Sequence, residues 1–433
     1  MDSHLKSGNR CKRSLLLNVT LKCIFGYNLL FTKFMLFENF YESFCSWSEA
    51  KLSDRDWLLK LTLFAVLISL FLAFPPYSLL VSHLKTNGVK LDAWVFIQNQ
   101  AQDLFHPKDM DYDVRRENMI LRWTLPSLSF ITNHNVVLIL IAQALCGILF
   151  LYNIGRYVFR ISADKVITGF LVLAIANIFV SVWTFADVHG YGDGFAYFFL
   201  LTALLSRNVF VTFISLQIAF FTDERAVVAG GYLLLWWIVV KAYEKQDFSL
   251  LGMIKAGLFG ESAVVWIAWL CYFGVRNYVL ATYFPNHSYS TIGTPVLFAN
   301  AHRNGLGSSI WSAFEGTWLL MGSALLALFL TRRYWLIAAL FIGFAVLLAT
   351  GIYVHDIDRA LSYGFPFILA AFFILYQTAS EASLRLILFF TMIICVIHPQ
   401  VFYMGYNKIL WLEPLPVKAF MLLDKMMSWN MFN

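Results

Sequence analysis

The sequence predicts an all-α protein, a polytopic transmembrane helical bundle with about 11 spans. Of its 433 residues, 60% are hydrophobic and only 13% are charged, whereas soluble proteins have about 45–50% and about 25%. A single soluble core of this size cannot hide so much apolar surface. The composition therefore excludes a soluble enzyme, a disordered chain and a disulfide-stapled secreted module. The six cysteines are scattered without a CxxC pair, so we expect neither a disulfide framework nor a cysteine metal site.

The first 56 residues differ from the rest of the chain. Arg10, Lys12 and Arg13 precede an apolar run, but polar residues interrupt it and no small-residue cleavage site follows, which does not fit a signal peptide. We expect an amphipathic helix that lies on the inner membrane surface; the alternative is that translation begins at Met35. The bundle then covers residues 57–402, and residues 403–433 form a C-terminal tail.

Eleven segments are candidates for spans, since a spanning helix needs about 20 apolar residues. The two segments on either side of Arg207 are only 13 residues long and are expected to be short, tilted or re-entrant. Pro75 and Pro76 are expected to kink or end the first span. The segments are Leu61–Val81, Asn135–Phe159, Val166–Ala186, Gly194–Ser206, Val209–Phe221, Ala226–Val240, Leu258–Thr282, Trp311–Leu330, Trp335–Tyr353, Leu361–Gln377 and Leu384–Phe402.

The basic residues set the predicted orientation. The net charge is +6, and we interpret the lysines and arginines as topology signals. With 11 spans and an inner N-terminus, ten of them fall in short inner loops and four in short outer loops. Fusing the two short segments would move Arg332 and Arg333 outside. We therefore predict a multi-pass protein of a bacterial inner or plasma membrane, with a cytoplasmic N-terminus and an outer C-terminus.

The first outer loop, residues 82–134, is the longest segment between spans, and its pattern suits helices that lie along the membrane surface. Within it, Asp92 sits among apolar residues. A carboxyl group in apolar surroundings has a raised pKa and can act as a general base. The alternative for Asp92 is an ordinary helix N-cap.

A second acidic motif, residues 187–194, follows the third span. It combines Asp187, His189 and Asp193 with three glycines, which let the backbone turn tightly and approach a ligand. This motif is interpreted either as a polar site that orients an acceptor hydroxyl or binds a divalent cation at Asp187 and Asp193, or as a plain turn in which Asp193 caps the next helix.

Further polar residues are predicted on the same outer side. Arginine suits phosphate because its planar guanidinium donates paired hydrogen bonds, and a histidine next to an arginine suits an anionic head group. Each of these residues also fits a wet outer loop with compensating charges. The candidates for substrate binding are His189, Arg225, His302, Arg303, Asp356, Asp358 and Arg359.

The layout resembles the GT-C class of integral-membrane glycosyltransferases. The resemblance rests on a long first outer loop with an early acid, Asp92, on the acidic motif after the third span, and on outer charge at residues 223–225 and 356–359. It covers most of residues 61–402. It implies a sugar donor carried on a polyprenyl phosphate and inverting transfer to a glycan or lipid acceptor on the outer face.

The resemblance also implies roles for individual residues. Asp92 would deprotonate the acceptor hydroxyl, and Asp187 or Asp193 would assist or orient the acceptor. Arg359, with Arg225 or His302, would hold the lipid phosphate and stabilise the departing charge.

Other functions stay open at this point. The sequence has no Walker loop, Rossmann glycine fingerprint, HExxH or GxSxG motif, which argues against ATP-driven transport and against an enzyme that uses a nucleotide sugar. No nucleic-acid partner is expected. The alternatives are a transporter or flippase for a lipid-linked or anionic solute, and a polysaccharide polymerase of a cell-envelope glycan pathway. A transporter is expected to have charges near mid-membrane and internal repeats. The sequence shows few such charges and no repeat.

Overall fold

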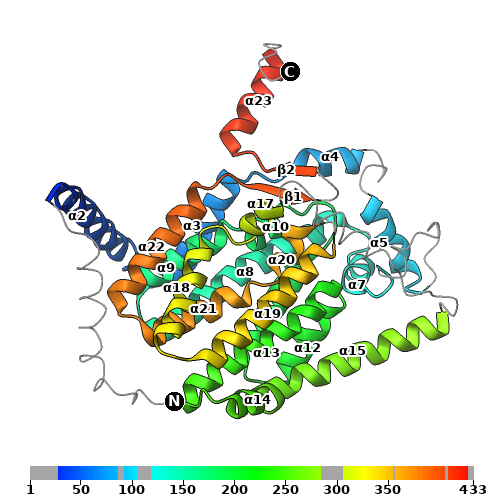
Figure 1. Cartoon of the computed structure of the whole chain (residues 1–433). Helices are drawn as coiled ribbons and strands as arrows, with labels where there is room; N and C mark the ends of the chain where they lie inside the picture. The colour runs from blue at the N-terminus through cyan, green and yellow to red at the C-terminus, as the bar shows by residue number, and fades with distance from the viewer. Residues whose placement is uncertain are drawn as a thin grey trace.

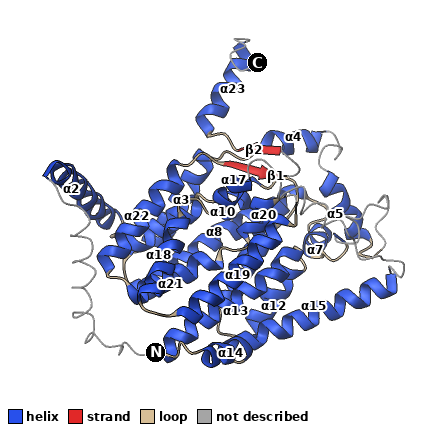
Figure 2. Cartoon of the chain, in the orientation of Figure 1, coloured by secondary structure: helices blue, strands red, loops and turns tan. Residues whose placement is uncertain are grey.

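The computed structural model describes residues 28–85, 92–105, 119–283, 306–354, 356–404 and 408–427. These residues form a helical bundle with one short two-stranded hairpin (Figures 1 and 2), which confirms the all-α prediction. In chain order the elements are α2 (Asn28–Lys51), α3 (Trp57–Leu72), α4 (Tyr77–Lys85), α5 (Asp92–Gln102), α7 (Thr124–Ile131), α8 (Val136–Ser162), α9 (Lys165–Ala176), α10 (Phe179–Ala186), α11 (Asp193–Leu205), α12 (Val209–Phe220), α13 (Glu224–Lys245), α14 (Leu250–Leu258), α15 (Glu261–Tyr283), α17 (Leu306–Ser312), α18 (Thr317–Leu330), α19 (Tyr334–Ile352), α20 (Ile357–Ser362), α21 (Pro366–Thr378), α22 (Glu381–Ile397), β1 (Val401–Met404), β2 (Lys408–Trp411) and α23 (Leu415–Met427).

Four described helices, α8, α13, α15 and α19, are long and apolar enough to cross a membrane. Three further pairs pass the same test together but are bent at a short break: α3/α4 by 77°, α9/α10 by 56° and α17/α18 by 84°. By length and composition the described helices therefore give four to seven candidate spans. The predicted count of about 11 is not reached, because α11, α12 and α21 are apolar but have only 12 or 13 residues, and α22 has 17, also below the 18-residue minimum.

Each bend has a local cause, and the sequence predicts only some of these causes. Pro75 and Pro76 separate α3 from α4, as expected for residues that cannot continue a helix. Asn177 ends α9, and a left-handed residue, Glu315 with φ of 46°, lies between α17 and α18. Each break leaves backbone N–H and C=O groups without a partner in the helix, so polar side chains gather at the breaks.

Apolar side chains face outward along several of the long helices. Leu270 of α15 and Ile342 of α19 expose 74% and 67% of their surface. Such patches are unusual on a soluble monomer. In contrast, α9, α10 and α21 are apolar and almost completely covered by other helices. An apolar shell around an apolar core is what contact with a lipid bilayer requires.

The two ends of the bundle carry different charges. At the basic end, defined by the turns that hold Lys165, Arg207, Arg333 and Arg385, ion pairs tie neighbouring turns together. Arg207 pairs with Glu244 of α13 at 2.5 Å, and Arg385 pairs with Asp164 before α9 at 2.6 Å. The opposite end, the acidic end, carries Asp187, Asp193, Asp223, Asp356 and Asp358, at the starts of α11, α13 and α20 or the end of α10.

Helices also form in the segments that were predicted to flank the bundle or to link its spans. Helix α2, from the predicted N-terminal segment, places Phe44 against Phe170 of α9 and Phe389 of α22, with ring centroids 5.9 and 5.6 Å apart. In the predicted first outer loop, α5 and α7 are short helices, and the charged stretch at residues 109–117 lies outside the described residues. The predicted tail contains β2 and α23, and α23 projects from the bundle (Figure 1).

Packing at the α17/α18 break gives a first test of the fold. A methyl group at Gly316 would lie 2.4 Å from the backbone oxygen of Thr391 in α22, so we expect Gly316→Ala to lower the free energy of unfolding by about 1–3 kcal/mol. Gly322, inside α18, has no atom of the described residues within 4 Å of the added carbon. Gly322→Ala is therefore the matched control and should be neutral or stabilising by up to about 1 kcal/mol. Thermal unfolding in detergent micelles measures both; equal effects would contradict the tight contact.

Candidate functional site

The turn between α10 and α11 is built around the Asp187 carboxylate. Its oxygens accept backbone hydrogen bonds from His189 at 3.1 Å, Tyr191 at 3.0 Å and Gly192 at 2.9 Å. Gly190 and Gly192 have φ of 87° and 78°, a conformation that glycine adopts without strain. Burial raises the pKa of Asp187, Asp193 adds to the rise, and Arg359 opposes it. Asp187 thus holds the shape of this turn.

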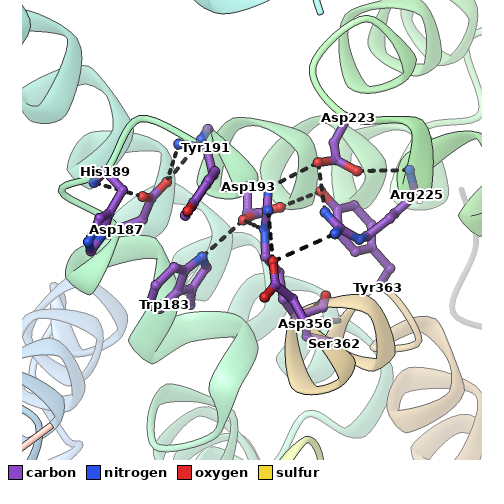
Figure 3. A network of polar contacts seen from close by, with 12 residues as sticks. Trp183, Asp187, His189, Tyr191, Asp193, Asp223, Arg225, Asp356, Ser362 and Tyr363 are labelled. Carbon is purple, nitrogen blue, oxygen red and sulfur yellow. Dashed lines mark hydrogen bonds and ion pairs between the residues drawn. The ribbon is translucent and has the colours of Figure 1, made fainter. Parts of the chain in front are cut away.

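Asp193, the first residue of α11, is completely buried and holds three partners (Figure 3). The Trp183 indole donates to Oδ2 at 2.9 Å, the Tyr363 hydroxyl donates to Oδ1 at 2.7 Å, and Arg359 Nε donates to Oδ2. The residue at the N-cap position of α11 is Gly192, and no side chain caps that helix. Asp193 therefore does not cap the helix, although the turn that the same alternative predicted is present around Asp187. The Asp193 carboxylate joins α10, α11 and the segment around α20.

Asp223 is the second buried carboxylate, and three arginines surround it. It caps α13 by accepting from the backbone nitrogen of Arg225 at 2.9 Å. Its Oδ2 lies 3.0 Å from Arg225 Nη1, 3.0 Å from Arg359 Nη2 and 3.5 Å from Arg122 Nη1. Burial disfavours the charged form of Asp223, but Arg122, Arg225 and Arg359 together outweigh burial and hold its pKa well below the usual range.

Two further carboxylates close the arginine cluster at its outer edge. Glu224 Oε1 accepts a hydrogen bond from Arg122 Nη2 at 2.6 Å. Asp356 lies 3.6 Å from Arg359 Nη1 and 3.9 Å from Arg225 Nη2. The exposed fractions of these side chains are 40% for Glu224, 22% for Asp356, 16% for Arg122 and 10% for Arg225, against 2% for Arg359. The network therefore has a closed inner side at Arg359 and an open edge at Arg122 and Arg225.

One arginine of the network keeps a donor without a partner in the described part of the chain. Arg225 Nε is buried and has no hydrogen-bond partner among the described residues, so this guanidinium has donor capacity left. The Tyr191 ring lies 4.2 Å from the guanidinium carbon of Arg359 and fixes its plane by a cation–π contact. A buried network of this kind stays folded because every charge in it has an opposite charge within reach.

The carboxylates do not fit a divalent cation. The oxygens of Asp187 are taken by backbone amides, and those of Asp193 by an indole, a phenol and a guanidinium. Calcium and magnesium need several free oxygen ligands around one point. Across the part of the chain that the structure describes, no group of three or more histidine, cysteine, aspartate or glutamate side chains is arranged to hold a metal ion.

The structure brings most of the sequence-predicted site residues together. Asp187, His189, Asp193, Arg225, Asp356 and Arg359 all belong to this network or to the turn beside it (Figure 3). Asp358 points elsewhere: it accepts from Ser312 Oγ at 2.6 Å and from the backbone nitrogen of Tyr403.

Three predicted residues are not placed with the network. Asp92 is the first residue of α5, but its side chain lies outside the described residues. Two residues later, Trp94 donates to the backbone oxygen of Val188 at 2.8 Å, so the start of α5 lies against the Asp187 turn. His302 and Arg303 also lie outside the described residues.

Sequence reasoning did not select Arg122 and Trp183 as site residues. Arg122 sits in the first outer loop, about 100 positions before its partners, and reaches them because Thr124 binds the end of α12 through the backbone oxygen of Phe221 at 3.1 Å. Trp183 lies inside an apolar helix, where an indole usually signals packing alone. A buried indole needs a hydrogen-bond acceptor, and the nearby carboxylates of residues 187–194 were the available signal.

Comparison with known proteins gives no match: no family model, no curated protein and no solved structure resembles this chain significantly.

Asp223 provides a test of the network. Asp223→Asn keeps an N-cap group but removes the charge, leaving three arginines short of a partner, so we expect the free energy of unfolding to fall by about 3–5 kcal/mol near neutral pH. The folded-state pKa lies below the unfolded value of about 3.9. The ionised carboxylate therefore stabilises the fold above about pH 4, and this contribution is lost as the pH falls through the folded-state pKa.

Unfolding of both proteins in detergent at a series of pH values measures this difference, which should shrink in acid. Glu244→Gln, which breaks the exposed pair with Arg207, is the control and should cost at most about 1 kcal/mol. A loss for Asp223→Asn no larger than for the control, or one independent of pH, would show that the network does not hold this end together.

Proposed function

We propose that this chain is a GT-C-like membrane glycosyltransferase that moves a sugar from a polyprenyl-phosphate donor to a glycan or lipid acceptor. The observation that carries the proposal is the convergence of three arginines from distant segments on Asp223, at one end of a bundle with an apolar outer surface. Guanidinium groups beside a lipid-facing surface suit a substrate that is both anionic and apolar.

The geometry suggests a division of labour among these residues. Arg225 and Arg122, at the open edge, bind the donor phosphate and stabilise the charge that grows on it as the bond from the sugar to the phosphate oxygen breaks. Arg359 and Asp193 are buried and act as positioning residues for that edge. Asp187 sets the turn next to the start of α5, where Asp92 is proposed to take the proton from the acceptor hydroxyl that attacks the sugar.

The proposal includes an orientation and a membrane. The acidic end faces the outside of a bacterial inner or plasma membrane, and the basic end faces the cytoplasm, as the positive-inside rule requires. With the short apolar helices and bent pairs counted as crossings or re-entrant segments, the chain passes the membrane about 11 times. The N-terminus is then cytoplasmic and the C-terminus lies outside.

A transfer assay tests the activity. Purified protein in lipid nanodiscs is incubated with polyprenyl-phosphate hexoses labelled in the sugar, and release or transfer of the label is followed. We expect Arg225→Gln to reduce the rate by about 100-fold, in line with the loss of one donor to a developing oxyanion, and Asp92→Asn to reduce it by about 100-fold or more.

Arg207→Gln is the matched control for Arg225→Gln, because it removes an arginine of the basic end and should leave the rate unchanged. No labelled product with any of the hexoses, or equal effects of the two arginine substitutions, would count against the transferase.

Surface labelling tests the orientation separately. In a cysteine-free background, Lys418→Cys in α23 should react with a membrane-impermeant maleimide on intact cells, and Lys245→Cys at the exposed end of α13 should react only after the membrane is permeabilised. The reverse pattern would invert the topology and place the arginine network on the cytoplasmic side.

A second candidate function is transport of an anionic or lipid-linked solute, and one observation favours it. Transporters carry discontinuous helices whose breaks hold polar groups at membrane depth, and the α17/α18 break holds a completely buried Glu315. A transporter would move a labelled polyprenyl-phosphate sugar across a vesicle membrane without consuming it, whereas the transferase would release or transfer its sugar.

A further inference from the structure

A separate polar cluster lies where α17, α18 and α22 meet. Its centre is Glu315, which has no exposed surface and a left-handed backbone with φ of 46°. A non-glycine residue held in that conformation costs free energy and often marks a functional position. Gly316, directly after it, packs against the backbone of α22, so the carboxyl group is fixed in place.

Among the described residues, no lysine or arginine forms an ion pair with Glu315. Its one ion-pair partner among the described residues is the imidazole of His398, with Nδ1 3.5 Å from Oε1. The other titratable groups that act on it are Asp358 on α20, which is itself acidic, and the buried Cys395 thiol on α22. A buried carboxylate in such surroundings needs a proton or a cation for compensation.

The hydrogen bonds of His398 fix which of its nitrogens carries the proton. Trp311 Nε1 lies 3.0 Å from His398 Nε2. An indole nitrogen only donates, so Nε2 must accept and carries no hydrogen. The neutral imidazole therefore carries its hydrogen on Nδ1, which faces Glu315. A doubly protonated imidazole would set two donors against each other at Trp311, so an additional proton cannot reside on His398.

Gln400 supplies the remaining contact. Its amide nitrogen donates to the backbone oxygens of Asn177 at 2.9 Å and of His398 at 3.3 Å, which fixes the orientation of the amide. Its oxygen Oε1 is buried without a hydrogen-bond partner among the described residues, as are both Glu315 oxygens and His398 Nδ1. The Gln400 side chain is close enough to act on the Glu315 carboxyl group.

We propose that Glu315, His398 and Gln400 form a proton-binding site in which Glu315 is a neutral carboxylic acid at pH 7. One proton then satisfies all four groups: the acid hydroxyl of Glu315 donates to Gln400 Oε1, and the other Glu315 oxygen accepts from His398 Nδ1. The His398 side chain is 25% exposed, so water reaches the edge of this site. This site is distinct from the arginine network and does not depend on its function.

Infrared spectroscopy detects the proton directly. The difference spectrum between the wild type and Glu315→Gln at pH 7 should contain the C=O stretching band of a protonated carboxyl group, shifted in D2O. Glu49→Gln, which changes an exposed carboxylate that pairs with Arg385, is the control and should remove no such band. Absence of the band from the Glu315 difference spectrum would overturn the proposal.

Trp311→Phe gives a second readout that does not alter the carboxyl group. Without the indole donor, His398 can carry two protons and take the proton of Glu315 as an ion pair, so the band should weaken and titrate at lower pH. An unchanged band would show that the indole does not set the protonation. If replacing choline chloride by sodium chloride removed the wild-type band, a sodium ion would be the occupant and the proposal would be wrong.

Discussion

The acidic end of the bundle depends on the pairing of charges that water cannot reach. Burying a lone carboxylate or guanidinium costs several kcal/mol. Arg359 lowers this cost for both Asp193 and Asp223, because it contacts both of them. Those three side chains come from the starts of α11 and α13 and from α20. Any rearrangement of one segment would leave a charge unpaired in the other two. The network therefore fixes the positions of these three segments more strictly than apolar packing alone.

Helix interruptions create the space for this chemistry. A continuous helix satisfies its own backbone and offers only side chains, whereas a break frees polar groups that must find partners. The turn after α10 uses Asp187 to bind three freed backbone amides, and the break before α18 carries Glu315. In a bilayer such irregular backbone is tolerated only where protein covers it or water reaches it. The polar clusters of this chain lie at its breaks for that reason.

The sequence was sufficient for the fold class and for the side of the bundle that carries the acids. Apolar segments of the right length, and the separation of Lys and Arg from Asp and Glu, are one-dimensional signals. The sequence was insufficient to predict which polar residues contact one another. Asp358 and Arg359 are adjacent in sequence, yet α20 sends Arg359 into the arginine network and Asp358 toward Ser312 and Tyr403. The pairing of Arg122 with Asp223 depends on how α7 packs against the end of α12, which no local pattern encodes.

The same helix α20 connects the two polar clusters. On one side Arg359 balances Asp193, Asp223 and Asp356. Its positive charge is therefore not available to Asp358 or to Glu315. A negative charge on Glu315, near the carboxylate of Asp358, would add repulsion in a medium where screening is weak. A proton on Glu315 removes that repulsion without drawing Arg359 away from its partners. The neutral Glu315 and the arginine network are therefore compatible. Arg359 on α20 stays with its carboxylate partners, because Glu315 does not need its charge.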